Sequence, residues 1–517
     1  MTANLRHLWP AILLALALFL GLSPAAMAHG FGERYDLPVP LGLYLAGAGA
    51  AVALSFVAIG VFVKAEASHG DYPRFNLLRW RLVGLIAGPW FSVSLRVASV
   101  ALLVLVIATG LYGDRSPTLN LAPTFVWVIW WVGLAYVSAL VGNLWAILNP
   151  WKAIFEGVEV VAGWLTGSRR LSLDVSYPAS WGVWPGVALF IVFAWIELVF
   201  PDSARPSNIA KLALAYSAIT WTGMLVFGKD RWLRSGEAFS LVFGLLSRFS
   251  PTEVRMTDPK VCKKCPADCL DAEGRCVNCY HCFHEASSPQ RELNLRPYGV
   301  GLLSSRPVTP SMMVLVVALL ATVSFDGVLA TSTWASIQNS LFNAFPSFDG
   351  HRLTVVDTAG LVGFGAIILA VFGAFSWLMS LAGGKEHTTG VIARYFVLSL
   401  LPIALGYHLA HFLTFLLIQG QPIIPLASDP FGRGWDIFGT TDFKTNISIV
   451  GARFAWFLAV IAIVIGHVIA VYLAHVVALR AFSERKHALR SQYPMLALMV
   501  GYTVLSLWIL AQPIVAE

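Results

Sequence analysis

The chain has 517 residues, of which 57% are hydrophobic and only 12% are charged. This composition is far too apolar for a soluble enzyme, and several stretches exceed the 18 apolar residues that identify a membrane-spanning helix. The net charge of +7 does not indicate nucleic-acid binding, because the basic residues are scattered over the segments between the apolar stretches.

Residues 1–28 predict a cleavable signal peptide. Two basic residues, Arg6 and His7, precede an apolar run that ends in the small-residue pattern Ala26-Met27-Ala28. An uncleaved anchor helix is the alternative interpretation of the same segment.

Beyond this segment the hydrophobic pattern predicts an all-α fold, namely a polytopic helical membrane protein with about ten transmembrane helices after a signal peptide. The predicted spans lie near residues 40–63, 93–113, 123–147, 183–201, 209–227, 310–331, 353–381, 391–419, 449–480 and 493–512. They divide into a first transmembrane group within 29–233 and a second within 310–517.

The segments between the spans alternate between many and few basic residues. Because Lys and Arg accumulate on the cytoplasmic side, this alternation predicts that the mature N-terminus and the C-terminus lie outside the cytoplasmic membrane. The long polar segment 234–309 is then cytoplasmic. Its first part, near Ser235 to Arg248, predicts an amphipathic helix lying on the membrane surface.

The rest of this cytoplasmic segment is a Cys-rich module that contains every cysteine of the chain. A reducing cytoplasm disfavours disulfides, and thiolates spaced two or three residues apart are typical of metal ligands. The spacing is C-x2-C-x3-C-x6-C-x2-C-x2-C. The candidate ligands are Cys262, Cys265, Cys269, Cys276, Cys279 and Cys282.

Two cofactors are compatible with this module. The run from Cys276 to Cys282 is similar to a ferredoxin run, which provides three ligands to a 4Fe-4S cluster, although the usual position of the fourth ligand is Ala286. The alternative is Zn, bound by the pairs Cys262/Cys265 and Cys276/Cys279, with His281 and His284 as spare ligands. The sequence leaves both cofactors open, and free thiols are a third interpretation.

Ionisable residues at membrane depth are rare without a function, and this chain has several. His408 and His411 are three residues apart and therefore share one helix face. His467, on the next span, lies at an overlapping depth. We expect these histidines to bind a divalent transition metal, with Asp326 as a nearby acid or further ligand. Glu197 lies near the end of its span, where contact with interfacial water is the simpler interpretation.

Three alternatives remain for the buried histidines. A pair of them could bind haem b, they could form hydrogen bonds that hold helices together, or they could be part of a proton path.

Several segments together resemble the bacterial polytopic membrane proteins known as fenitrothion hydrolases. They are His29 to Pro40, Gly236 to Ser240, Phe325-Asp326-Gly327, Tyr407 to His411 and the Asp429 to Asp436 segment. The resemblance implies hydrolysis of the aryl ester of an organophosphorus triester, a small hydrophobic substrate, to a nitrophenol and a dialkyl thiophosphate.

These observations lead to one hypothesis and two rivals. The hypothesis is a membrane-bound triester hydrolase in which a metal-activated water attacks phosphorus, with Asp326, His408 and His411 as catalytic residues. The first rival is a redox or metal-handling membrane protein that uses the Cys-rich module and the intramembrane histidines. The second is a transporter whose buried Asp and His residues carry protons.

Overall fold

The structure is a computed structural model, and the residues that it describes are 35–63, 72–168, 170–262, 275–304, 306–344 and 352–516. The predicted signal peptide and the cysteines Cys265 and Cys269 lie outside the described residues.

The protein is an all-α multi-pass membrane protein, which confirms the predicted fold class. Ten helical segments of the described chain are long and apolar enough to cross a membrane. The segment Leu121–Leu140 is built from three consecutive pieces, and the segment Thr389–Gln419 contains two α-helices. The helices of the ten spans are α2 (Leu41–Phe62), α5 (Pro89–Tyr112), α6 (Leu121–Pro123), the π-helical segment Thr124–Gly133, α7 (Leu134–Leu140), α10 (Trp184–Leu198), α11 (Pro206–Phe227), α15 (Pro310–Leu329), α17 (Arg352–Ala382), α18 (Thr389–Phe396), α19 (Leu401–Gln419), α21 (Ala452–Ala481) and α22 (Arg485–Ile514).

Proline residues mark the beginnings of many of these helices. Pro89, Pro206 and Pro310 each occupy the first turn of a span, where the missing N–H costs nothing and the fixed backbone angle favours a helix. At α15 the side chain of Thr309 also caps the first turn by accepting a hydrogen bond from the backbone N–H of Met312.

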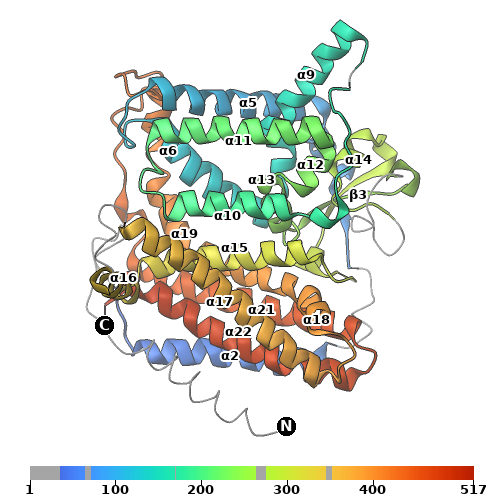
Figure 1. Ribbon diagram of the computed structural model, residues 1–517, viewed down its shortest axis with the longest axis vertical. Helices are drawn as coiled ribbons and strands as arrows, with labels where there is room; N and C mark the ends of the chain where they lie inside the picture. The colour runs from blue at the N-terminus through green and yellow to red at the C-terminus, as the bar shows by residue number, and fades with distance from the viewer. Residues whose placement is uncertain are drawn as a thin grey trace.

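The spans run roughly parallel and form two groups (Figure 1). The first group contains α5, α10 and α11, and the second contains α2 together with α15 and the later spans. Contacts of α15 with α10, and of α19 with the π-helical segment, join the two groups. The strand β3 and helix α14 lie at one end of the bundle, and α16 lies at the other (Figure 1).

Two glycines allow an especially close approach within the second group. A Cβ atom on Gly406 of α19 would lie 2.7 Å from the carbonyl oxygen of Ala462 on α21. A Cβ atom on Gly466 of α21 would lie 2.6 Å from the carbonyl oxygen of Pro402 on α19. Small residues at facing positions let helix backbones meet, which is how membrane helices gain packing energy without a hydrophobic driving force.

Shorter helices connect the spans or cover their ends. They are α4 (Arg81–Ile86), α8 (Trp145–Leu148), α9 (Pro150–Thr166), α12 (Lys229–Ser235), α13 (Ala238–Leu246), α14 (Tyr280–Glu285), α16 (Ser332–Ala344) and α20 (Ile423–Ser428).

Helix α13 occupies the position expected for an amphipathic helix on the membrane surface, but its surroundings differ from that expectation. Its residues are buried except for Ser240 and Gly244, which are half-buried. Phe239 and Phe243 pack against Trp130 and Trp131, and the buried side chain of Glu237 caps the helix. A helix resting on a membrane would leave one face uncovered. Here aromatic side chains from the neighbouring spans cover that face.

Two small sheets complete the described structure. At one, β1 (Tyr35–Asp36) pairs in parallel with β5 (Val515–Ala516), which joins the two ends of the described chain. In the other, β4 (Arg291–Leu295) pairs antiparallel with both β2 (Phe75–Asn76) and β3 (Thr252–Met256). This three-stranded sheet is the framework of the Cys-rich module.

Candidate functional site

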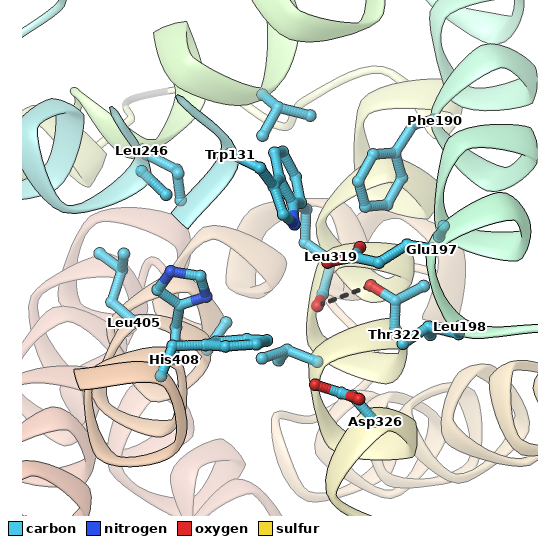
Figure 2. Close-up of a pocket in the computed structure, with 16 residues that line it drawn as sticks. Trp131, Phe190, Glu197, Leu198, Leu246, Leu319, Thr322, Asp326, Leu405 and His408 are labelled. Carbon is cyan, nitrogen blue, oxygen red and sulfur yellow. Dashed lines mark hydrogen bonds between the residues drawn. The ribbon is translucent and has the colours of Figure 1, made fainter. Parts of the chain in front are cut away.

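A partly open cavity lies where the two helix groups meet (Figure 2). Its volume is about 50 Å³. Since one water needs roughly 10–15 Å³ by this measure, there is room for about three to five waters. The lining is mostly apolar, and its polar side chains come from Glu197, Thr322, Asp326 and His408. The cavity therefore combines an apolar wall with a few converging polar groups, as small-molecule sites do.

Glu197 enters the cavity wall from α10. The indole N–H of Trp131, in the π-helical segment, interacts with its carboxylate. π-Helical stretches are rare and are often found at functional sites. Figure 2 shows Glu197, Asp326 and His408 on different sides of the same hollow. Glu197 thus has a place in the cavity in addition to its position near a span end.

Asp326 on α15 and His411 on α19 are joined by a direct hydrogen bond. Nε2 of His411 donates to Oδ2 of Asp326 at 2.9 Å. The Asp326 side chain is 26% exposed and that of His411 is 11% exposed, so the pair is reached from outside the protein. The ring of Tyr407 stacks against that of His411 at 5.9 Å and limits its rotation. The two residues, which the sequence analysis expected to lie close together, are thus hydrogen-bonded to each other.

His408 is held in place on both its backbone and its ring. The hydroxyl of Tyr136 donates to the carbonyl oxygens of His408 and Leu409, at 3.1 Å in each case. The imidazole interacts with the backbone of Val132 and packs against Phe412. Its Nε2 is buried and makes no hydrogen bond within the described residues. A ring nitrogen of this kind, on a residue that lines a polar cavity, is available to a water or a ligand.

The third predicted metal ligand, His467, does not line this cavity. Its ring is fully buried, and its Nδ1 lies 2.8 Å from the carbonyl oxygen of Ile463, one turn earlier on the same helix. Its ring is 6.1 Å from that of Tyr502, whose hydroxyl hydrogen-bonds to Ser324. The structure therefore brings Asp326, His408 and His411 together and places His467 in a separate polar cluster.

The polar residues that line the cavity determine what chemistry it can support. His408 has a ring nitrogen suited to accept a proton, and Asp326 and Glu197 are two carboxylic acids in the lining of the same cavity. Groups of this kind, held in an apolar-walled cavity, are suited to general acid–base chemistry on a bound water or to proton exchange.

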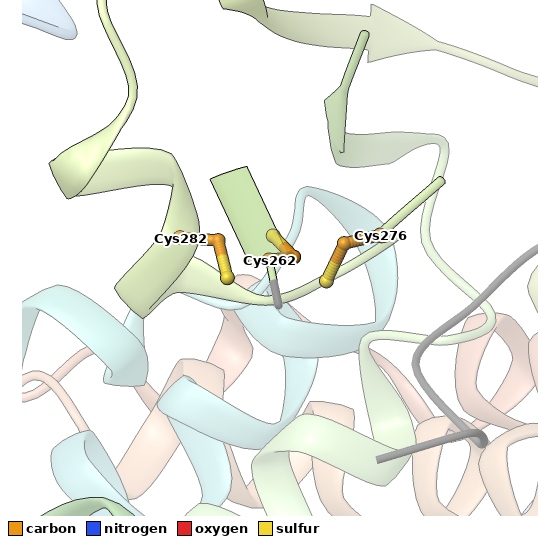
Figure 3. A group of neighbouring side chains, drawn as sticks. All are labelled: Cys262, Cys276 and Cys282. Atoms are coloured by element: carbon orange, nitrogen blue, oxygen red, sulfur yellow. The ribbon is translucent and has the colours of Figure 1, made fainter. Parts of the chain in front are cut away.

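The cysteines form a second candidate site, at the end of the bundle that carries β3 and α14. The Sγ atoms of Cys262, Cys276 and Cys282 lie within 4.8 Å of one another, and all three side chains are buried (Figure 3). In the part of the chain that the structure describes, this is the one group of three His, Cys, Asp or Glu residues with their ligand atoms so close. Cys279 is buried in the same apolar cluster but is not part of the group.

A buried ionic network joins the segment before β2 to the Cys-rich module. Glu253 on β3 is fully buried and accepts hydrogen bonds from Arg296 at 2.7 Å and Arg74 at 2.5 Å. The Tyr72 hydroxyl donates to the same carboxylate at 2.8 Å. Close to the cysteines, burial raises the pKa of the Tyr280 phenol to about 12, so this residue stays protonated at neutral pH.

Some of these features escaped the sequence analysis. Trp131 lies in an aromatic run that reads as membrane-interface anchoring, and only the packed structure shows that it turns toward Glu197. Glu253 could have been noticed as an acidic residue flanked by strand-forming residues, but its partners Arg74 and Arg296 lie 179 and 43 residues away.

Comparison with known proteins gives no match for this chain, whether to a family model, to a curated protein or to a solved structure.

Proposed function

We propose that the protein is a membrane-bound hydrolase of organophosphorus triesters, with the cavity between α10, α15 and α19 as its active site. One observation carries the proposal. The Nε2 atom of His408 is buried and has no hydrogen-bond partner among the described residues, and His408 lines the same cavity as Asp326 and Glu197. The resemblance to fenitrothion hydrolases supports the substrate class.

In the proposed reaction, Nε2 of His408 accepts a proton from a water, and the water oxygen forms a bond to phosphorus. The bond between phosphorus and the aryl oxygen breaks, and its electron pair leaves with the aryl oxygen as a phenolate. The carboxylate of Asp326 stabilises the positive charge gained by His408. A nitrophenolate is a good leaving group, so the reaction depends little on protonation of its oxygen.

The volume of the cavity limits how such a substrate would bind. About 50 Å³ accommodates the water and part of the phosphoryl group, but not a whole aryl triester. Apolar side chains that line the cavity must therefore move apart as the aryl group enters. An apolar triester partitions into lipid, so access from the bilayer between the two helix groups suits its chemistry.

In a second version of the same reaction, a metal bound by His408, His411 and His467 activates the attacking water in place of a general base. The position of His467 supports the general-base version, because that ring lies beside Tyr502 and not in the cavity wall. The alternation of basic residues supports an orientation with the active site toward the outer face of the inner membrane and the cysteines toward the cytoplasm.

The first test is nitrophenol release from fenitrothion by washed membranes that contain the protein, with empty-vector membranes as control. Release above the control supports the hydrolase, and its absence in membranes shown to contain folded protein contradicts it. A parallel chelator series separates the two versions of the reaction. Activity that falls with chelation and returns with one added metal favours the metal-activated water.

A second candidate function is a redox or metal-handling membrane protein, and the close approach of three buried cysteine sulfur atoms favours it. Reversible visible absorbance changes on reduction of the purified protein would support electron transfer through the Cys-rich module. A protein without such changes would leave metal handling as the remaining form of this candidate.

A further inference from the structure

The three clustered cysteines come from separate parts of the Cys-rich module. Cys262 ends the short turn Pro259–Cys262 that follows β3, Cys276 lies beside β3, and Cys282 lies on α14. The backbone N–H of Met256 on β3 donates to the carbonyl oxygen of Cys276 at 2.9 Å. Figure 3 shows the three sulfur atoms turned toward a common space.

The spacing of the sulfur atoms distinguishes two kinds of metal centre. In a tetrahedral site with Zn–S bonds of about 2.3 Å, the thiolate sulfurs lie about 3.8 Å apart. In a 4Fe-4S cluster each thiolate binds a different iron, so the thiolate sulfurs lie roughly 6 Å apart. The observed group, within 4.8 Å, is too compact for the cluster and close to the tetrahedral arrangement.

The surroundings of the triad suit a structural metal. Val254, Met256, Phe283 and Ala286 are buried in the same apolar cluster as the cysteines. A site enclosed in this way excludes solvent and substrate, which is characteristic of structural zinc sites. Zinc also has no redox chemistry, so such a centre would not transfer electrons.

We propose that Cys262, Cys276 and Cys282 bind a single zinc ion as thiolates and that this ion holds the module together. The ion joins the turn after β3, the segment beside β3 and α14, none of which has a large core of its own. The fourth ligand of the tetrahedron lies outside this triad. Because ligands of this kind are assembled only in the folded chain, the binding energy of zinc contributes to the stability of the module.

This inference does not depend on the proposed hydrolase function, because the triad and the cavity are on different elements. It does bear on the second candidate. A mononuclear zinc centre favours metal handling or a structural role over electron transfer.

The test uses the full-length protein purified in mild detergent under reducing conditions. Elemental analysis should find zinc at about one equivalent per chain, and X-ray absorption at the zinc edge should show sulfur at about 2.3 Å. Replacing zinc with cobalt should produce the intense visible bands of a tetrahedral thiolate complex. Iron with acid-labile sulfide in place of zinc, or zinc without sulfur ligands, would overturn the proposal.

Variants then test the assignment of the ligands. Cys276→Ser and Cys282→Ser should each lower the zinc content by about tenfold, since each removes a thiolate ligand. Cys279→Ser is the matched control, because Cys279 is buried in the same apolar cluster but its sulfur is not part of the triad. An equal loss of zinc in the control, or full zinc content in both triad variants, would contradict the assignment. The X-ray absorption spectrum of the unaltered protein keeps the test informative if the triad variants fail to fold.

Discussion

Asp326 on α15 and His411 on α19 are joined by a 2.9 Å hydrogen bond between residues 85 positions apart in the chain. The bond connects a carboxylate that lines the cavity to an imidazole outside its lining. It therefore fixes the position of Asp326 relative to His408, which precedes His411 by three residues on the same helix. In the proposed reaction, His411 is a positioning residue and His408 is the base.

Replacing His408 should have the largest effect on triester hydrolysis. We expect His408→Ala to lower kcat by about 10²–10⁴-fold, the usual contribution of a general base. The measurement is nitrophenol release at saturating substrate, normalised to the amount of folded protein in the membrane. His487→Ala is the control, since His487 contacts Glu386 in the segment between α17 and α18 and does not line the cavity. Equal activity of the two variants would remove His408 from the mechanism.

The Asp326–His411 pair should act as a unit. Asp326→Asn and His411→Ala should each lower kcat by about 10–100-fold, as for other residues that orient a reacting group. The double variant should lose little more than either single variant, because the first substitution already breaks the pair. Losses that multiply in the double variant would show that the two residues act independently.

The sequence predicts the spans well and the cavity only in part. Each of the ten predicted spans overlaps a helix of the structure, because lipid demands long apolar helices whose length and hydropathy are visible locally. Likewise, the three-residue spacing places His408 and His411 on adjoining parts of one face. The depth of His467 in the bilayer suggested that it joins His408 and His411, but depth does not determine the direction in which a side chain points. Only tertiary packing turns that ring toward Tyr502.

The ionic network around Glu253 should make a large contribution to the stability of the Cys-rich module. Glu253 and its partner Arg296 are almost fully buried, so Glu253→Gln leaves buried guanidinium groups without their counterion. The expected loss is about 3–5 kcal/mol of unfolding free energy. Limited proteolysis or hydrogen exchange of β3 and β4 measures it. Asp174→Asn, which removes an exposed ion pair with Arg170, should have little effect. Similar protection in the two variants would contradict the prediction.

A second stability prediction concerns pH. Hydrogen bonds from His487 and from the backbone and hydroxyl of Ser483 lower the pKa of Glu386 from 4.5 to about 2. Because the folded state favours the charged carboxylate, this contribution is complete above about pH 4.5 and is lost as the pH falls toward 2. The midpoint of thermal unfolding should therefore fall less steeply between pH 5 and about pH 3 in Glu386→Gln than in the unaltered protein. Parallel curves would show that Glu386 has the same pKa in both states.

The close approach of α19 and α21 should make this helix contact sensitive to added side-chain volume. Gly466→Ala places a Cβ atom 2.6 Å from the carbonyl oxygen of Pro402, so the two helices must separate. We expect a loss of about 1–3 kcal/mol in unfolding free energy, as for other overpacked interiors. Activity should fall as well, because α19 carries His408 and His411.

Gly373→Ala is the matched control for this substitution. Gly373 is also a glycine within a spanning helix, but a Cβ atom there would meet nothing within 4 Å. Alanine is the better helix former, so this variant should be as stable as the unaltered protein or slightly more stable. Chemical unfolding in mixed micelles compares the two variants. Equal stabilities would mean that α19 and α21 can move apart at little cost, and the cavity wall formed by α19 would then be less rigid than the proposed mechanism requires.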